Sequence, residues 1–139
     1  ERKFKTWITP HSMEFLRLFP DIESETHVGL ALKAAKEFNI SVLLKGANSI
    51  VADNKKAWQL FGTDSQTARA GLGDLLSGFV AGSSAIDLTF SRDITTEFFA
   101  KYVLLHSFAA SKCKTGSNAS AIGDELSKLM RNGKTRQIS

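Results

Sequence analysis

Residues 71–74 contain two glycines and a carboxylate, and they are the best candidates in this sequence for a catalytic role. Gly71 and Gly73 precede Asp74, and an apolar pattern of helical period begins among them, at Leu72, Leu75, Leu76, Phe79 and Val80. The first backbone N–H groups of such a helix have no partner within it, and the helix dipole makes this end attractive to anions. Glycine lets a phosphate approach the backbone, and a carboxylate there can accept the proton of a hydroxyl that attacks phosphorus. The pattern therefore predicts a phosphoryl-transfer centre in which Asp74 is the base.

This glycine turn differs from the common nucleotide-binding fingerprints. No Lys-Ser or Lys-Thr follows the glycines as in a Walker A loop, and Leu76 stands where a dinucleotide fingerprint has its third glycine. An acidic first turn is also common in helices without a catalytic role. A purely structural role for Asp74 is therefore the alternative.

Strand and helix patterns alternate along the chain, which predicts an α/β fold. Strands are expected at residues 4–8, 40–44, 49–52 and 57–61, and helices at 13–19, 23–38, 72–81, 95–113 and 119–130. The continuous apolar run 40–44 suits a strand buried on both faces, and the two strands after it suit a hairpin at the rim of the sheet. Pro10 suits the first turn of the first helix, and Gly82-Ser83-Ser84 is expected to end the helix that follows the glycine motif. Since the strands are too few for a complete doubly wound sheet, we expect the C-terminal half of a longer protein.

Size, composition and charge narrow the class of protein. The 139 residues suit one domain or part of a larger one, and 42% hydrophobic and 23% charged residues give a soluble, globular balance. The net charge of +4 attracts anionic ligands, but no basic face interleaved with aromatic residues predicts nucleic-acid binding. The lone cysteine, Cys113, excludes an internal disulfide and favours a reducing compartment, and no His or Cys cluster predicts a metal site. Since neither a membrane span nor a signal segment is predicted, we expect a cytoplasmic location.

Three segments, in order along the chain, resemble the motifs of one family. Residues 9–14 (TPHSME) resemble T-P-H-P-G-E, residues 44–52 (LKGANSIVA) resemble L-K-G-A-x-T-V-I-A, and residues 68–78 (ARAGLGDLLSG) resemble A-T-G-G-S-G-D-V-L-A-G. On these segments the chain resembles the ADP/ATP-dependent NAD(P)H-hydrate dehydratases of the ribokinase-like superfamily. The resemblance implies a three-layer fold whose mostly parallel sheet is flanked by helices and is incomplete at the N-terminus. Residues 1–139 would then form a single, partial domain.

The activity that the resemblance implies is the repair of hydrated NADH or NADPH by a hydro-lyase. ADP or ATP, with Mg²⁺, phosphorylates the hydroxyl of the hydrated ring, and loss of phosphate restores the dihydronicotinamide. Homo-oligomers are usual in the family. The missing N-terminal part of the same protein is a further implied partner.

The matched positions imply the roles of individual residues. Asp74 would contact the substrate hydroxyl and act as the base, and His11 would contact the hydrated cofactor. The nucleotide is expected at Lys45, Gly46, Ala47, Asn48, Ser49, Gly71 and Gly73. A histidine after a proline can also simply cap a helix, which is the alternative for His11.

Several residues depart from the family's motifs. Ser12 and Met13 replace proline and glycine, which opens another path for the His11 loop, whereas Ser49 keeps the hydroxyl of threonine. Asp64 stands where G-N-P is usual, and Arg69-Ala70 replaces Thr-Gly. Two alternatives stay open. One is a ribokinase-like kinase of a sugar or vitamin hydroxyl, in which Asp74 would serve in the same way, and the other is a catalytically degenerate nucleotide-binding domain, which the departures at Asp64 and Arg69 motivate.

Overall fold

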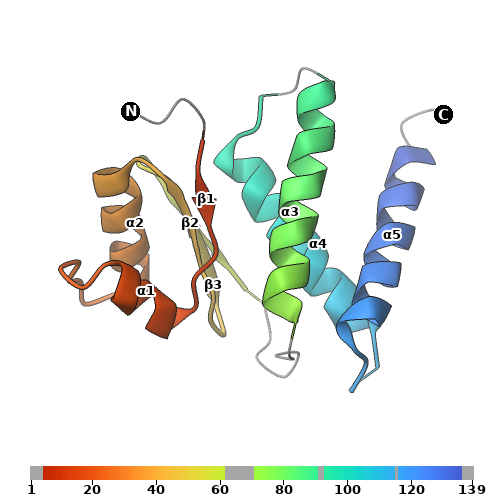
Figure 1. The fold of residues 1–139 in the computed structure, drawn as a ribbon, viewed down its shortest axis with the longest axis horizontal. Coiled ribbons are helices and arrows are strands. Elements are labelled where there is room, and N and C mark those ends of the chain that lie inside the picture. The colour runs from red at the N-terminus through yellow and green to blue at the C-terminus, as the bar shows by residue number, and fades with distance from the viewer. Residues whose placement is uncertain (1–4, 62–70, 91–92, 115, 136–139) are drawn as a thin grey trace. The chain divides into compact units, whose positions relative to one another are not determined.

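The computed structural model describes residues 5–61, 71–90, 93–114 and 116–135 (Figure 1). The chain divides into two compact units. Unit 1 comprises Glu1–Thr63 and Ile94–Ala100, and unit 2 comprises Asp64–Asp93 and Lys101–Ser139. Helix α4 (Thr96–Lys112) begins in unit 1 and continues in unit 2. Among the described helices, none is long and apolar enough to cross a membrane.

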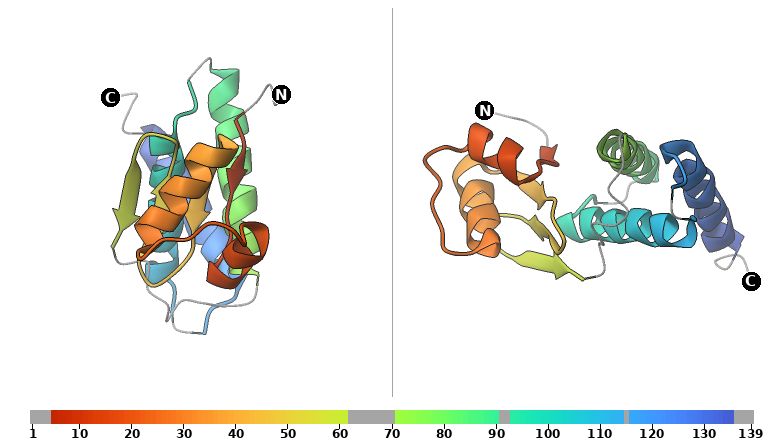
Figure 2. Two further views of the ribbon diagram at one scale, coloured as in Figure 1. Left: turned by 90° about the vertical axis from the view of Figure 1, so that its left-hand side faces the viewer. Right: turned by 90° about the horizontal axis from the view of Figure 1, so that it is seen from below.

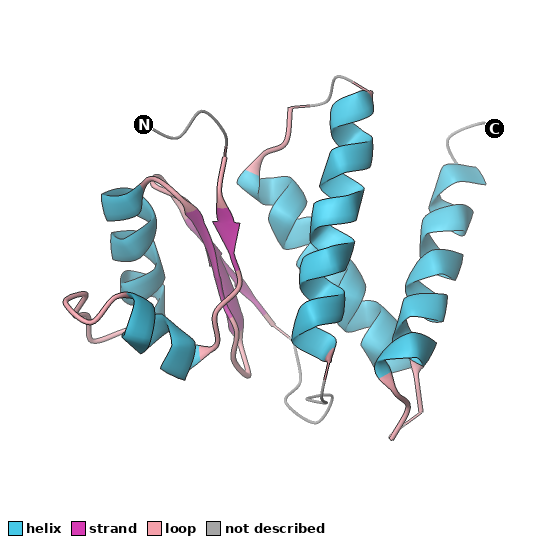
Figure 3. Ribbon diagram, in the orientation of Figure 1, coloured by secondary structure: helices cyan, strands magenta, loops and turns pink. Residues whose placement is uncertain are grey.

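Unit 1 is built on a four-stranded sheet (Figure 3). Its strands, in spatial order, are β1 (Trp7–Ile8), β2 (Ser41–Leu44), β3 (Ser49–Ala52) and β4 (Ala57–Leu60). The β1 and β2 strands pair in parallel, and the β2–β3 and β3–β4 pairs are antiparallel. Every residue of β2 and β3 is buried, so the prediction of a strand buried on both faces is confirmed, as is the hairpin.

Helices α1 (Ser12–Leu18) and α2 (His27–Phe38) cover one face of this sheet (Figure 2). Val42 and Leu44 point to that face because alternate residues of a strand share a side. They belong to a core to which the two helices and the loop between them contribute Phe15, Phe19, Ile22, Ala31, Ala34 and Ala35. The packing of these helices therefore fixes the strands β1 and β2, which the T-P-H and K-G-A segments follow in the chain.

The ends of α2 follow from its capping residues. The Thr26 hydroxyl accepts a hydrogen bond from the Gly29 N–H (3.0 Å), and Asn39 ends the helix in the left-handed conformation with φ 49°. The helix predicted from residue 23 therefore begins later, at His27, because Thr26 is its N-cap.

The start of α4 contacts the other face of the sheet. Trp7 and Phe99 stack with their ring centroids 4.6 Å apart, and the hydroxyl oxygens of Ser41 and Thr96 lie 3.0 Å apart. Lys5 Nζ also donates to the carbonyl of Ile94 (2.6 Å). These contacts place the segment Ile94–Ala100 in unit 1 although it is distant in sequence from the sheet.

The described part of unit 2 contains α3 (Leu72–Thr89), the rest of α4, and α5 (Ala119–Thr135). Ile122 and Leu126, which are four residues apart on one face of α5, pack with Ala109 and Ala110 of α4. Between α3 and α4, the Tyr102 hydroxyl donates a hydrogen bond to the Asp87 carboxylate, and both side chains are buried.

Besides the start of α2, three further predictions of helix boundaries are wrong. The α3 helix continues through Gly82-Ser83-Ser84 to Thr89, and the Ser84 hydroxyl donates to the Val80 carbonyl within the helix (2.7 Å). One glycine costs a helix about 1 kcal/mol, which burial of its neighbours, including Ser83, can outweigh. The α5 helix likewise continues past Met130 to Thr135. Pro10 precedes α1, because His11 is the N-cap.

Candidate functional site

The T-P-H and K-G-A segments follow two neighbouring parallel strands and lie side by side. Ligands of α/β proteins bind beyond the carboxyl ends of such strands. The Lys45 N–H donates to the Pro10 carbonyl (2.9 Å), and an isolated parallel bridge joins His11 to Lys45. The structure thus brings His11 and Lys45 together at this edge of unit 1.

Glu14 connects these two segments. The Glu14 N–H donates to His11 Nδ1 (3.2 Å), and the Glu14 carboxylate accepts a hydrogen bond from the His11 N–H (2.7 Å). This capping box starts α1 at Ser12. The same carboxylate lies 3.3 Å from His11 Nε2 and 3.8 Å from Lys45 Nζ. The hydrogen bond from the His11 backbone, and then the charge of Lys45, hold the pKa of Glu14 below its usual value, so the carboxylate stays ionised.

The K-G-A segment ends at Ser49, whose hydroxyl closes the loop. Ser49 Oγ donates to the Gly46 carbonyl (3.3 Å) and lies 3.4 Å from the Gly46 N–H. Ser49 is buried at the start of β3, while Gly46, Ala47 and Asn48 are exposed. The exposed part of this loop is therefore open to a ligand, and its base is held by a hydroxyl hydrogen bond.

The glycine motif of unit 2 begins α3 in the manner that an anion site requires. Gly71 is the N-cap and has φ 82°, a left-handed conformation that favours glycine. The Leu75 N–H already donates to the Gly71 carbonyl (2.9 Å), and no described side chain caps the N–H groups before it. Asp74 lies exposed on this first turn and makes no ion pair with any described residue.

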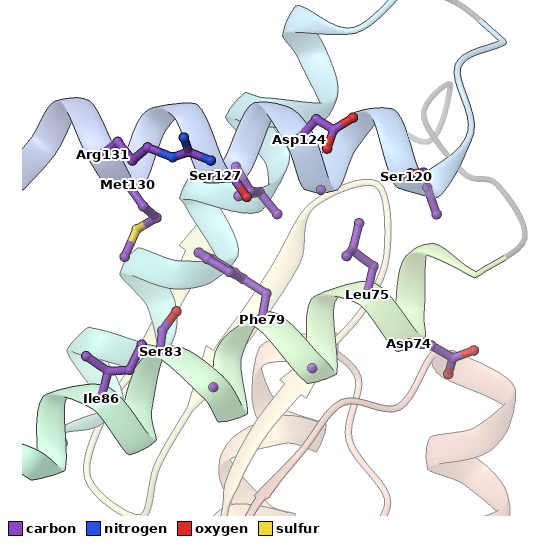
Figure 4. A pocket seen from close by; sticks show the side chains of 15 residues that line it. Asp74, Leu75, Phe79, Ser83, Ile86, Ser120, Asp124, Ser127, Met130 and Arg131 are labelled. Carbon is purple, nitrogen blue, oxygen red and sulfur yellow. The ribbon is translucent and has the colours of Figure 1, made fainter.

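A groove of about 920 Å³ runs between α3 and α5, within unit 2 (Figure 4). Asp74 and Ser120 lie toward one end, and Met130 and Arg131 lie toward the other. Apolar side chains such as Leu75 and Phe79 and three glycines, Gly78, Gly82 and Gly123, line it between those ends. The glycine motif thus opens onto a mainly apolar groove, to which Ser83, Asp124 and Ser127 add polar side chains along its length.

The predicted site residues form two groups. His11, Lys45 and the loop 46–49 belong to unit 1, and Gly71, Gly73 and Asp74 belong to unit 2. Asp64 and the pair Arg69-Ala70 lie outside the described residues. Sequence reasoning gave Glu14 no role; the available signal was its place three residues after the helix-capping histidine, which is the spacing of a capping box.

Comparisons with known proteins agree on the class. A family model described as NAD(P)H-hydrate dehydratase matches residues 1–131. The bifunctional NAD(P)H-hydrate repair enzyme Nnr of Synechocystis is 38% identical over 82 residues, which are 58% of this chain and 16% of that enzyme. The ADP-dependent (S)-NAD(P)H-hydrate dehydratase of Listeria monocytogenes is 35% identical over 108 residues, which are 75% of this chain and 35% of that enzyme.

Solved structures share the fold. A ribokinase-like superfamily protein of Enterococcus faecalis aligns with a TM-score of 0.76 and 26% identity, over 91% of this chain and 44% of that one. The ADP/ATP-dependent NAD(P)H-hydrate dehydratase of Bacillus subtilis, co-crystallised with ATP/Mg²⁺, aligns with a TM-score of 0.72 and 17% identity, over 95% of this chain and 49% of that one. The chain thus spans about half the length of these structures, and its fold is ribokinase-like.

The family follows from the match over nearly the whole chain. This chain belongs to the NAD(P)H-hydrate dehydratase family. The motif resemblance and the α/β fold predicted from the sequence are both confirmed.

Proposed function

We propose that this chain takes part in the nucleotide-dependent dehydration of hydrated NADH or NADPH. Support comes from the family match together with one observation: the helix with Asp74 on its first turn begins at a left-handed glycine that leaves its N–H groups uncapped by any described side chain. Such a helix start suits the terminal phosphate of a nucleotide. ADP is the nucleotide named for the Listeria enzyme, and ATP was present with the Bacillus enzyme.

Asp74 is the proposed base. Its carboxylate takes the proton of the ring hydroxyl as that oxygen attacks the terminal phosphorus, and the bond from phosphorus to the nucleotide breaks. The phosphate then leaves the ring carbon with the bonding electrons, and a ring proton is lost, which restores the dihydronicotinamide. The backbone N–H groups of Leu72 and Gly73, on the first turn of the helix, are the proposed donors to the transferred phosphoryl group.

Lys45 and the loop to Ser49 are the proposed contacts of the nucleotide, and His11 the proposed contact of the hydrated ring. An ammonium group suits phosphate oxygens, and an imidazole can hydrogen-bond to a ring hydroxyl or carboxamide. Mg²⁺ would neutralise the nucleotide's phosphates. Since no group of three His, Cys, Asp or Glu side chains in the described residues could hold a metal, we propose that Mg²⁺ arrives bound to the nucleotide. A homo-oligomer, which the family resemblance implies, and a cytoplasmic location belong to the same proposal.

The test is recovery of the absorbance of reduced cofactor when the protein is incubated with hydrated NADPH, Mg²⁺ and either ADP or ATP. Asp74→Asn should lower the rate by about 10²- to 10⁴-fold, the usual contribution of a general base. Asp21→Asn, at an exposed aspartate of unit 1, is the control and should leave the rate unchanged.

Other outcomes would reject the proposal. A phosphorylated small molecule that accumulates would favour the kinase alternative. ADP binding without turnover, unaffected by Asp74→Asn, would favour a degenerate nucleotide-binding domain.

A further inference from the structure

Lys45 is the predicted phosphate contact of unit 1. A contact is required to hold its long, flexible side chain at the edge of the sheet. A free lysine side chain samples many rotamers, and fixing it costs conformational entropy. Its side chain is 28% exposed, and its Nζ lies 3.8 Å from a Glu14 carboxylate oxygen. Glu14 is thus the described group that holds the Lys45 ammonium where the two loop segments meet.

Glu14 is itself held firmly by the backbone. The capping box fixes it to His11, and the next residue, Phe15, is 1% exposed in the core beneath α1. The Lys45 backbone is fixed by its hydrogen bond to the Pro10 carbonyl. Both partners of the ion pair therefore project from positions that the fold defines, and the pairing costs less entropy than one between two mobile side chains.

The same contacts orient His11. Since His11 Nδ1 accepts the Glu14 N–H, the neutral ring carries its proton on Nε2, and this nitrogen lies 3.3 Å from a Glu14 carboxylate oxygen. One carboxylate therefore meets a side-chain donor from each of the two loop segments.

We propose that Glu14 is a positioning residue that holds the Lys45 ammonium ready for the nucleotide's phosphates. This inference rests on the proposed function and adds to it a residue that need not touch the reacting atoms. The inference predicts the direction in which nucleotide affinity changes when the charge of Glu14 is removed. A carboxylate near a phosphate site should repel the nucleotide, so simple removal of its charge should tighten binding. If Glu14 acts by positioning Lys45, its removal should weaken binding instead.

Glu14→Gln separates positioning from helix capping. Glutamine can replace glutamate in a capping box, so this variant keeps the start of α1 while it loses the charge that pairs with Lys45. We expect the dissociation constant for ADP, measured by calorimetry, to rise about two- to fivefold, while the cooperative melting transition shows that the variant remains folded. Glu97→Gln removes the partner of Lys56, another ion pair of unit 1, and is the matched control with unchanged ADP affinity.

A double-variant cycle tests whether the effect passes through Lys45. In the Lys45→Gln background, Glu14→Gln should no longer weaken ADP binding. Tighter binding by Glu14→Gln, no change in binding, or an equal loss in the Lys45→Gln background would each overturn the inference.

A measurement on the free protein distinguishes failure of this inference from failure of the proposed function. An ion-paired Lys45 ammonium should give a ¹H–¹⁵N signal, assigned with Lys45→Gln, that shifts in Glu14→Gln and not in Glu97→Gln. If wild type fails to bind ADP, the proposed function is wrong, and this signal still decides whether Glu14 holds Lys45. An ammonium signal unmoved by Glu14→Gln would overturn the inference whatever the nucleotide does.

Discussion

His106 lies buried in unit 2, and its titration should make the stability of the protein depend on pH. The residue is 8% exposed, and its Nε2 has no hydrogen-bond partner among the described residues. Burial lowers the pKa of His106 below its usual 6.5, because the imidazolium ion would lose its hydration there. The folded protein therefore keeps His106 neutral at a pH where the unfolded chain protonates it.

The sign of the pH dependence follows from this difference. Above pH 6.5, His106 is neutral in both the folded and the unfolded protein, so its titration does not lower the free energy of unfolding. Below pH 6.5, the unfolded chain takes up a proton at His106, whereas the folded protein keeps this residue neutral. The free energy of unfolding then falls as the pH drops toward the lowered pKa of the folded state, by at most about 1.4 kcal/mol per pH unit for this one group. The loss stops once the folded state also takes up the proton.

His106→Leu should remove this dependence. Leucine fills similar space without a titrating group, and it removes a buried nitrogen whose missing hydrogen bond costs roughly 1–3 kcal/mol. The variant should therefore be at least as stable as wild type at about pH 7.5, and its advantage should grow as the pH falls below the usual histidine pKa.

Urea unfolding followed by circular dichroism, at a series of pH values on both sides of 6.5, measures the effect. His27→Asn, at an exposed histidine in the first turn of α2, is the control and should follow the wild-type curve. If wild type and His106→Leu lose stability in parallel as the pH falls, the buried imidazole is not the cause and the reasoning is refuted.

Two further substitutions test the geometry of unit 2. Gly71→Ala puts a side chain on a residue with φ 82°, so it should lower the free energy of unfolding by about 1–2 kcal/mol and weaken ADP binding. Urea titration measures the stability, and calorimetry measures the affinity for ADP. An unchanged affinity would argue against a nucleotide at this turn. Tyr102→Phe removes a hydrogen-bond donor from the buried Asp87 carboxylate and should lower the free energy of unfolding by roughly 1.5–3 kcal/mol. An unchanged urea midpoint in Tyr102→Phe would mean that this hydrogen bond has no net value.

Elements whose burial follows a short repeat could be predicted from the sequence. The apolar run 40–44 predicted a strand buried on both faces, and the helix expected at 95–113 is present as α4, because strand and helix periods are local properties. The end of α3 could not be predicted in the same way. Gly82-Ser83-Ser84 is a local stop signal, and the burial of Ser83 and Asp87, which only the tertiary packing reveals, overrides it.

The candidate site likewise has features that the local sequence predicts and a contact that only the tertiary structure reveals. Asp74 and Lys45 were predicted because each lies in a motif that is contiguous in the sequence. The contact of Glu14 with Lys45 depends on the pairing of β1 with β2, which lie on either side of two helices in the chain. A contact of that kind is set by the register of the sheet, so sequence spacing alone did not reveal it.

The departures from the family's motifs can be judged by where the structure places them. Ser12 is the first residue of α1, a position at which proline is favoured, so serine and proline are both compatible with the same helix start. Met13 follows and is 58% exposed, so the replacement of glycine adds a side chain at an exposed position. Ser49 uses the hydroxyl that it shares with threonine to hold Gly46. The backbone bridge from His11 to Lys45 forms with these residues present, and with it the anchor on which Glu14 depends, while a path of the His11 loop that differs from the family's stays a prediction.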